Sequence, residues 1–422
     1  MAKLTQFRDP FASLLQSAVD EIVARKSADI TRPDPAHPMK QMAAVDGHAM
    51  TAPPGAATED AASPLRYCAS LARQYGEAVL EGRTADANHF HELLTQKMGD
   101  CDPDWADTAI KYGEFLLAKG KIPYRVYQNI DDYVIDGKLP ANARVAIVGD
   151  WGTGQQPAIK VLEQIARKNP DVVIHMGDVY YSGTDFEMQN YFYNIWSQTL
   201  NLSKIPTFTL SGNHDMFSGG APYYKLIDQL GQPSSYFCLR NDDWQFVAMD
   251  TGLHDSDPLG TTPTYLEDTE LAWVADKIQN RGNRRTVLLS HHQLFAANEP
   301  ICGQSVNPRL NEQLSPLLPN VALWLWGHEH NLVVYQKYLG VLARCIGHGA
   351  FPIGVGEIPE TPIYPEVPIV PVPLGNDGTF LNHGYVIMDL AGSSATLSYY
   401  QDSDEANPQY TETLAASATA AP

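Results

Sequence analysis

Two short apolar runs, RVAIVGD at residues 144–150 and DVVIHMGD at residues 171–178, each end in Gly-Asp. Both runs are rich in β-branched residues, which predicts buried strands. A helical pattern at 156–168 lies between them, so this part of the chain predicts a strand, a helix and a second strand. Strands that alternate with helices indicate an α/β layer architecture.

Three further predicted strands follow along the chain, and each of them also ends in polar residues. They are IPTFTLSGNHD (205–215), RTVLLSHH (285–292) and VALWLWGHEH (321–330). The sequence also predicts a hairpin of SYFCLR with WQFVAMD, a helix at 266–281, and an antiparallel set of strands towards the C-terminus. We therefore expect one α/β domain at 139–402, followed by a flexible tail at 403–422.

The first 138 residues have a different pattern. Apolar side chains at helical spacing predict helices at 10–26, 64–82, 86–98 and 103–118. Residues 28–63 are rich in proline without periodicity, which predicts an extended linker. We expect this α-helical N-terminal region (1–138) to serve as a lid, or as the contact between copies in a homo-oligomer.

The charge of the chain indicates which kinds of molecule it binds. The chain has 422 residues, with 49 acidic and 29 basic side chains, and a formal charge of −20. This balance argues against a protein that grips nucleic-acid phosphates, because that affinity comes from lysine and arginine. It is compatible with a small phosphorylated substrate held by metal ions, because bound cations invert the local field.

The chain shows no secretory signal pattern at its start and no long uninterrupted apolar run, so we expect no membrane span and a cytoplasmic location. Its five scattered cysteines indicate reduced thiols in that compartment. A single disulfide and a leader removed before this sequence begins stay open as alternatives.

The polar residues that end the strands form a set suited to metal ions. A single Gly-Asp after a strand is usually a turn, but the pattern recurs in order along the chain. In an open α/β sheet the carboxyl ends of strands are where ligands bind. Carboxylates, imidazoles and an amide oxygen together suit zinc, manganese or iron. The candidates are Asp150, Asp178, Asn213, His291, His328 and His330.

This ordered pattern, GD, GD, GNHD, a strand-ending histidine and GHEHN, resembles that of the calcineurin-like metallophosphoesterases over about residues 143–400. The resemblance implies a four-layer α/β/β/α sandwich and a binuclear metal centre that hydrolyses phosphate esters by attack of a metal-bound hydroxide. The common first motif of the family is Asp-x-His, whereas this chain has Asp150-Trp151-Gly152. Tyr181, three residues after Asp178, is a candidate replacement, and this pairing resembles the purple acid phosphatase branch, in which a tyrosinate binds ferric iron.

The resemblance also implies a role for each residue. One ion would be held by Asp150, Asp178, Tyr181 and His330, and the other by Asp178, Asn213, His291 and His328. The pair would be Fe(III) with Fe(II), Mn(II) or Zn(II).

Neighbouring residues offer alternatives and partners for this set. His292 is an alternative to His291, and Tyr180 competes with Tyr181, although strand-like alternation would point the two phenols apart. His214 would donate a proton to the leaving group, and Asp215 would orient it.

The resulting prediction is a purple-acid-phosphatase-like phosphomonoesterase. The alternatives are a phosphodiesterase, including one for cyclic nucleotides, and a non-catalytic metal-binding scaffold. No arginine or lysine lies beside the motifs, the nearest being Lys225 and Arg309, and this leaves the diester alternative open. His348 and, more weakly, Tyr364 are candidates for the wall of the substrate pocket.

Overall fold

The structure is a computed structural model that describes residues 10, 13, 14, 16–18 and 21, and residues 122–255 and 262–416. The described residues of the predicted 10–26 helix are helical. The predicted linker and the helices predicted at 64–82, 86–98 and 103–118 lie outside the described residues.

The first of two β-sheets contains the runs that open the pattern. Its six strands lie in the order β14-β13-β12-β2-β3-β4, with β2, β3 and β4 parallel and β12 antiparallel to β2. The strands are β2 (Arg144–Val148), β3 (Val172–His175), β4 (Thr207–Thr209), β12 (Gly384–Ala391), β13 (Ser394–Gln401) and β14 (Tyr410–Leu414).

The second sheet has eight strands in the order β1-β5-β6-β7-β8-β10-β9-β11. Strands β6, β7 and β8 are parallel, whereas β5 and β6 form the predicted antiparallel hairpin. The strands are β1 (Val134–Asp136), β5 (Phe237–Arg240), β6 (Trp244–Ala248), β7 (Arg285–Ser290), β8 (Val321–Trp326), β9 (Leu332–Tyr335), β10 (Ala343–Ile346) and β11 (Ile369–Val370).

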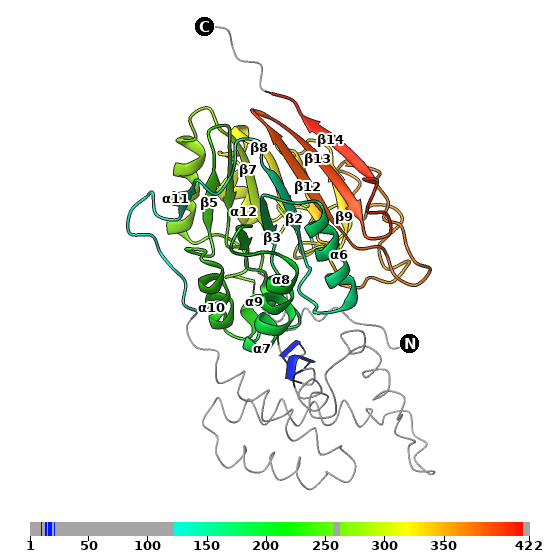
Figure 1. The fold of residues 1–422 in the computed structure, drawn as a ribbon. Helices are drawn as coiled ribbons and strands as arrows, with labels where there is room; N and C mark the ends of the chain where they lie inside the picture. Colours follow the sequence, from blue (N-terminus) through cyan, green and yellow to red (C-terminus); the bar gives the residue numbers. More distant parts are fainter. Residues whose placement is uncertain are drawn as a thin grey trace, which may run out of the picture.

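Side-chain alternation along the strands builds the layers. In β2, Val145 and Ile147 face the core between the sheets, whereas Ala146 and Val148 face the helices on the other side. Both faces of β2 are buried, which explains why its sequence is apolar throughout. Side chains of the second sheet likewise alternate between the core between the sheets and the helices on its outer face. The result is the predicted four-layer α/β/β/α sandwich, visible in Figure 1.

Helices cover the outer face of each sheet. On the first sheet they are α6 (Gln156–Arg167), the π-helix η1 (Met188–Tyr193), α8 (Asn194–Thr199) and α10 (Ala221–Leu230). On the second they are α11 (Asp268–Gln279) and α12 (Pro308–Leu314). Three short elements complete the set: α7 (Asp185–Glu187), α9 (Asn213–Phe217) and the 3-10 helix η2 (Leu318–Asn320).

The edges of the sandwich differ from the predicted domain bounds. Residues 122–138, expected with the N-terminal region, lie against the sandwich, where β1 pairs with β5 and the Tyr124 hydroxyl donates to Glu270 at 2.9 Å. The tail predicted at 403–422 contains β14, which pairs with β13 along the edge of the first sheet. The described sandwich therefore begins before residue 139 and ends after residue 402.

Two further expectations concern membranes and cysteines. Among the described helices, none has both the length and the apolar character that crossing a bilayer requires. In the described part of the chain, the buried Cys238 and Cys345 carry free thiols.

Candidate metal centre

The loops after β2 and β3 place two buried carboxylates side by side. Asp150 and Asp178 adopt φ angles of 54° and 72°, in the left-handed region that non-glycine residues rarely occupy. The Asp150 amide donates to the Gly177 carbonyl at 3.2 Å, which joins the two loops. Gly177 has no room for a side chain, because a Cβ there would lie 2.8 Å from His291 Nδ1. Strained backbone of this kind is found where the fold holds functional groups.

The first group of candidate ligands is Asp150, Asp178 and His330, whose ligand atoms lie within 4.8 Å of one another. His330 Nε2 is 3.4 Å from Asp150 Oδ1. The hydroxyl of Tyr180 lies among them, 3.0 Å from Asp150 Oδ1, 3.2 Å from Asp178 Oδ2 and 2.8 Å from His330 Nε2. A phenol has one proton, so the Tyr180 hydroxyl donates to only one of the two carboxylates. The remaining lone pairs suit a shared cation.

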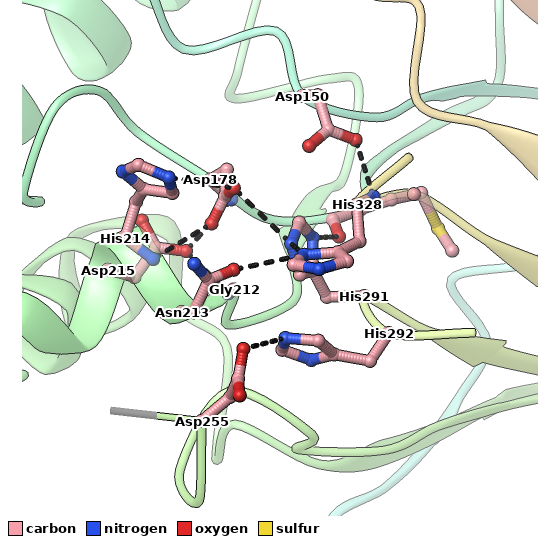
Figure 2. A network of polar contacts seen from close by, with 12 residues as sticks. Asp150, Asp178, Gly212, Asn213, His214, Asp215, Asp255, His291, His292 and His328 are labelled. Atoms are coloured by element: carbon pink, nitrogen blue, oxygen red, sulfur yellow. Dashed lines mark hydrogen bonds and ion pairs between the residues drawn. The ribbon is translucent and has the colours of Figure 1, made fainter. Parts of the chain in front are cut away.

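The second group comes from α9 and from the ends of β7 and β8. His328 Nδ1 is 3.2 Å from the Asn213 amide oxygen and 3.3 Å from His291 Nε2. His291 Nε2 is in turn 3.3 Å from Asp178 Oδ2, so Asp178 adjoins both groups. Figure 2 shows Asp178 between the Asn213–Asp215 segment and the ring of His291.

The charges around His291 indicate that this second group favours a positive charge. The Met176 carbonyl accepts from His291 Nδ1 at 2.9 Å, so Nε2 is the ring atom that faces Asp178. Burial lowers the pKa of His291, but Asp178 and Asp150 outweigh this effect and raise it to about 10. Asp178 is also buried, yet the histidines around it hold its pKa well below the usual value. The residues of both groups would thus fit a pair of cations, and Asp178 lies next to both groups.

The structure separates the adjacent histidines His291 and His292. His292 Nε2 lies 2.8 Å from Asp255 Oδ2, and its Nδ1 lies 3.0 Å from the Thr251 hydroxyl. Both of its ring nitrogens therefore have protein partners, although the ring packs 4.4 Å from that of His328. His291 is the better candidate ligand.

We predict that His291→Ala loses one of two metal ions per chain, whereas His292→Ala retains both. The two substitutions remove the same side chain at adjacent buried positions, so each is the control for the other. Metal analysis of the purified variants, with thermal unfolding to confirm folding, gives the readout. The assignment would be reversed if His292→Ala were the variant that lost the ion.

The tyrosine in the structure differs from the predicted one. The Tyr180 hydroxyl contacts Asp150, Asp178 and His330, whereas Tyr181 contributes its backbone: its amide donates to Glu187 Oε1 at 2.5 Å, and its carbonyl lies 2.5 Å from His214 Nδ1. The physical reason is that β3 ends at His175 and the backbone is left-handed at Asp178, so strand alternation does not extend to the two tyrosines.

The predicted pair His214 and Asp215 also adopts a different arrangement. The Tyr181 carbonyl, and not Asp215, accepts from His214 Nδ1, which leaves Nε2 4.0 Å from Asp178 Oδ2. The Asp215 carboxylate accepts from the backbone amides of Gly212, Asp178 and Val179 at 2.7–3.0 Å. Burial and the nearby Asp178 raise the pKa of Asp215 to about 7, so these donors hold an otherwise unfavourable charge. Asp215 fixes the ligand loops and does not orient His214.

The remaining candidates lie outside the two groups. His348 is buried, and burial with the neighbouring His383 lowers its pKa to about 3. The Tyr364 amide donates to the Ala297 carbonyl in the proline-rich loop.

Sequence reasoning missed Glu187, a fully buried carboxylate beside the Tyr180–Thr184 loop. Its signal was present as the capping-box pattern Thr184-x-x-Glu187, and the structure has both hydrogen bonds of that box.

Comparison with known proteins agrees with this site. Residues 143–332 match the model of the calcineurin-like phosphoesterase family. The chain is similar to the glycerophosphodiester phosphodiesterase GpdQ of Enterobacter lignolyticus, with 26% identity over 46% of this chain and 68% of the relative. It is also similar to a probable GpdQ of Arcobacter nitrofigilis, with 25% identity over 30% of this chain and 43% of that protein.

Solved structures show more distant similarity. A dimetal phosphatase from Danio rerio has 12% identity and a TM-score of 0.46, covering 66% of this chain and 100% of its own. GAP50, the anchor in the inner membrane complex of Plasmodium, has 14% identity and a TM-score of 0.46, covering 67% of this chain and 91% of its own. The family match spans β2 to the start of β9 and includes every candidate ligand. Residues 143–332 therefore match a calcineurin-like phosphoesterase domain, and this match supports a hydrolytic phosphoesterase.

Proposed function

We propose that this protein is a binuclear metal-dependent phosphodiesterase. Asp150, Asp178, Tyr180 and His330 would hold one ion, and Asp178, Asn213, His291 and His328 the other. The bound ions supply Lewis-acid activation of water and neutralise charge on the phosphate oxygens. The donor set supports this proposal, because it combines carboxylate, imidazole, phenol and amide groups in one buried cluster.

The observation that carries the diester preference is the charge around the centre. Among residues 122–255 and 262–416, no lysine or arginine forms an ion pair with Asp150 or Asp178. Lys225 pairs instead with Asp185 at 2.8 Å, and the Arg309 guanidinium lies 3.5 Å from the centroid of the Tyr265 ring.

Fixed negative charge disfavours a monoester more than a diester. A phosphate monoester carries about −1.5 to −2 charge near neutral pH, because its second pKa is about 6. A diester carries a single negative charge and is repelled less by the Asp255 carboxylate, which lies 2.8 Å from His292. The similarity to relatives named glycerophosphodiester phosphodiesterases supports the same preference.

His214, in its doubly protonated form, is the residue we propose for proton transfer to the leaving oxygen; burial lowers its pKa, and the neighbouring Asp178 opposes this effect. Because its Nδ1 is engaged by the Tyr181 carbonyl, Nε2 is the atom that faces Asp178 and the reaction centre. The neighbouring rings of Tyr180 and Phe217, each with its centroid 4.8 Å from that of His214, hold the imidazole in this orientation.

A second candidate is a purple-acid-phosphatase-like monoesterase. The observation that favours it is a tyrosine hydroxyl beside Asp150 and His330, where Gly152 takes the place of the histidine common in the first motif. Iron at that position would then be bound by a tyrosinate.

Substrate kinetics distinguish the two candidates. The protein should be loaded separately with iron, manganese and zinc and assayed with bis(p-nitrophenyl) phosphate, p-nitrophenyl phosphate and a glycerophosphodiester. We expect kcat/KM for diesters to exceed that for the monoester by at least about tenfold, a difference of about 1.4 kcal/mol in the transition state. A monoester preference would support the second candidate, and metal-loaded protein inactive on all three would contradict both.

A further inference from the structure

Glu187 lies at the start of the π-helix and faces the loop that carries the active-site tyrosine. It has no exposed surface. One carboxylate oxygen accepts from the Tyr181 amide at 2.5 Å, and the other accepts from the amides of Ser182 and Thr184 at 3.1 and 2.9 Å. A buried carboxylate needs this number of donors, because burial alone raises its pKa. The backbone from Tyr181 to Thr184 is thus wrapped around one side chain.

This loop determines where two active-site groups lie. Its first part places the Tyr180 hydroxyl against Asp150, Asp178 and His330. Its next carbonyl, that of Tyr181, accepts from His214 Nδ1 at 2.5 Å. A shift of the Tyr181 peptide therefore moves a candidate ligand and the proposed proton donor together.

The loop is closely packed against α9, which leaves it few alternative positions. Gly183 has a φ of 58°, and a Cβ there would lie 2.6 Å from the Cα of Asp215. The Ser218 hydroxyl donates to the Gly183 carbonyl at 2.9 Å. Glu187 holds the loop from one side, and α9 holds it from the other.

A residue of the N-terminal region completes this arrangement. The Ser17 side chain lies close to the Glu187 carboxylate and helps to lower its pKa. Ser13, Leu14, Ser17 and Ala18 are each at most 1% exposed, so this face of the helical segment is buried. In Figure 1 the segment, drawn in blue, lies beside α7.

We propose that Glu187 is a positioning residue for the metal centre and that Ser17 holds it in place, so the N-terminal segment is a functional part of the phosphoesterase site. The expected change in kcat rests on the proposed phosphodiesterase function, whereas the expected change in metal affinity does not. Partners one step removed from a metal ligand typically change metal affinity or activity by about 10–100-fold when they are mutated.

The test compares Glu187→Gln and Ser17→Ala with matched controls in the full chain. Glutamine keeps the size of Glu187 but places an NH₂ group against backbone donors. Glu163→Gln makes the same change at an exposed position on α6, where the side chain pairs with Arg167 at 3.9 Å. Ser197→Ala is the control for Ser17, because each hydroxyl also donates to a backbone carbonyl of its own helix, at 3.1 Å.

Metal affinity, measured with manganese and zinc by competition against a chelator, is the primary readout, with kcat and KM for bis(p-nitrophenyl) phosphate as the second. We expect Glu187→Gln to weaken binding of one of two ions by about tenfold or more and to lower kcat more than it raises KM. Ser17→Ala should change the metal affinity and kcat in the same directions, but by smaller factors. In the double variant it should add nothing further, because its effect passes through Glu187.

Folded Glu187→Gln protein with unchanged metal affinity and kcat would overturn the proposal. If Glu187→Gln fails to fold, Ser17→Ala decides, and unchanged metal affinity in that variant overturns the proposal equally. Failure of the proposed function would give a different result, because wild-type protein would bind two ions and hydrolyse no ester. The metal affinities of wild-type and Glu187→Gln protein could then still be compared.

Discussion

Asp178→Ala should abolish phosphoester hydrolysis and release both metal ions. Asp178 adjoins both candidate groups, with Oδ2 at 3.3 Å from His291 Nε2 and at 3.2 Å from the Tyr180 hydroxyl. Removal of its carboxylate takes a donor from each ion at once. We expect kcat/KM to fall by at least about 1,000-fold, the order of loss that follows removal of a group acting at the reacting centre.

Metal analysis and steady-state kinetics with an aryl phosphodiester check this expectation. Asp228→Ala is a suitable control, because Asp228 is exposed on α10 and pairs with Arg125 at 2.8 Å. An Asp178→Ala protein that kept two ions per chain and normal turnover would refute the assignment of the whole centre.

Tyr180→Phe should remove the visible absorption band of iron-loaded protein, whereas Tyr181→Phe should leave it. The unperturbed pKa of a phenol is about 10, and burial beside Asp150 and Asp178 raises that of Tyr180 further. Only a strong Lewis acid such as ferric iron makes its anion stable there at neutral pH. Tyrosinate bound to ferric iron gives a charge-transfer colour.

The adjacent tyrosines form a matched pair, because each substitution deletes one oxygen and keeps the ring. The absorption spectrum after iron loading is the measurement, and the iron content of each variant is its control. The opposite result, loss of the band in Tyr181→Phe alone, would restore the residue predicted from the spacing of the motif. A band that survived in both would exclude either phenol as a ligand.

Most of the fold could be predicted from the sequence, because the strands that matter are buried on both faces. RVAIV, VVIH and VALWLW carry no polar interruption, and each is followed by residues that a strand end would expose to a ligand. The candidate ligands Asp150, Asp178, Asn213, His291, His328 and His330 were predicted for this reason, and the structure brings them together.

The features that escaped prediction depend on pairing with other strands. Strand β14 (Tyr410–Leu414) has the largely polar sequence YTETL and forms because β13 is present to pair with it. Strand β1 likewise forms a parallel pair with β5, about 100 residues further along the chain.

The roles of Asp215 and Tyr181 were expected from the resemblance to a known family, and the local backbone departs from that expectation. The helix α9 begins at Asn213, which turns the Asp215 carboxylate towards the Gly212 amide.

The two sheets divide the candidate ligands between them, and this has a consequence for how the protein acquires its metals. Asp150, Asp178 and Asn213 follow strands of the six-stranded sheet, whereas His291, His328 and His330 follow strands of the eight-stranded one. Neither sheet alone holds a complete donor set, so tight binding must await their docking face to face. The ions then stabilise only the assembled sandwich, and their effect should appear in the unfolding rate while the early steps of folding proceed at the metal-free rate.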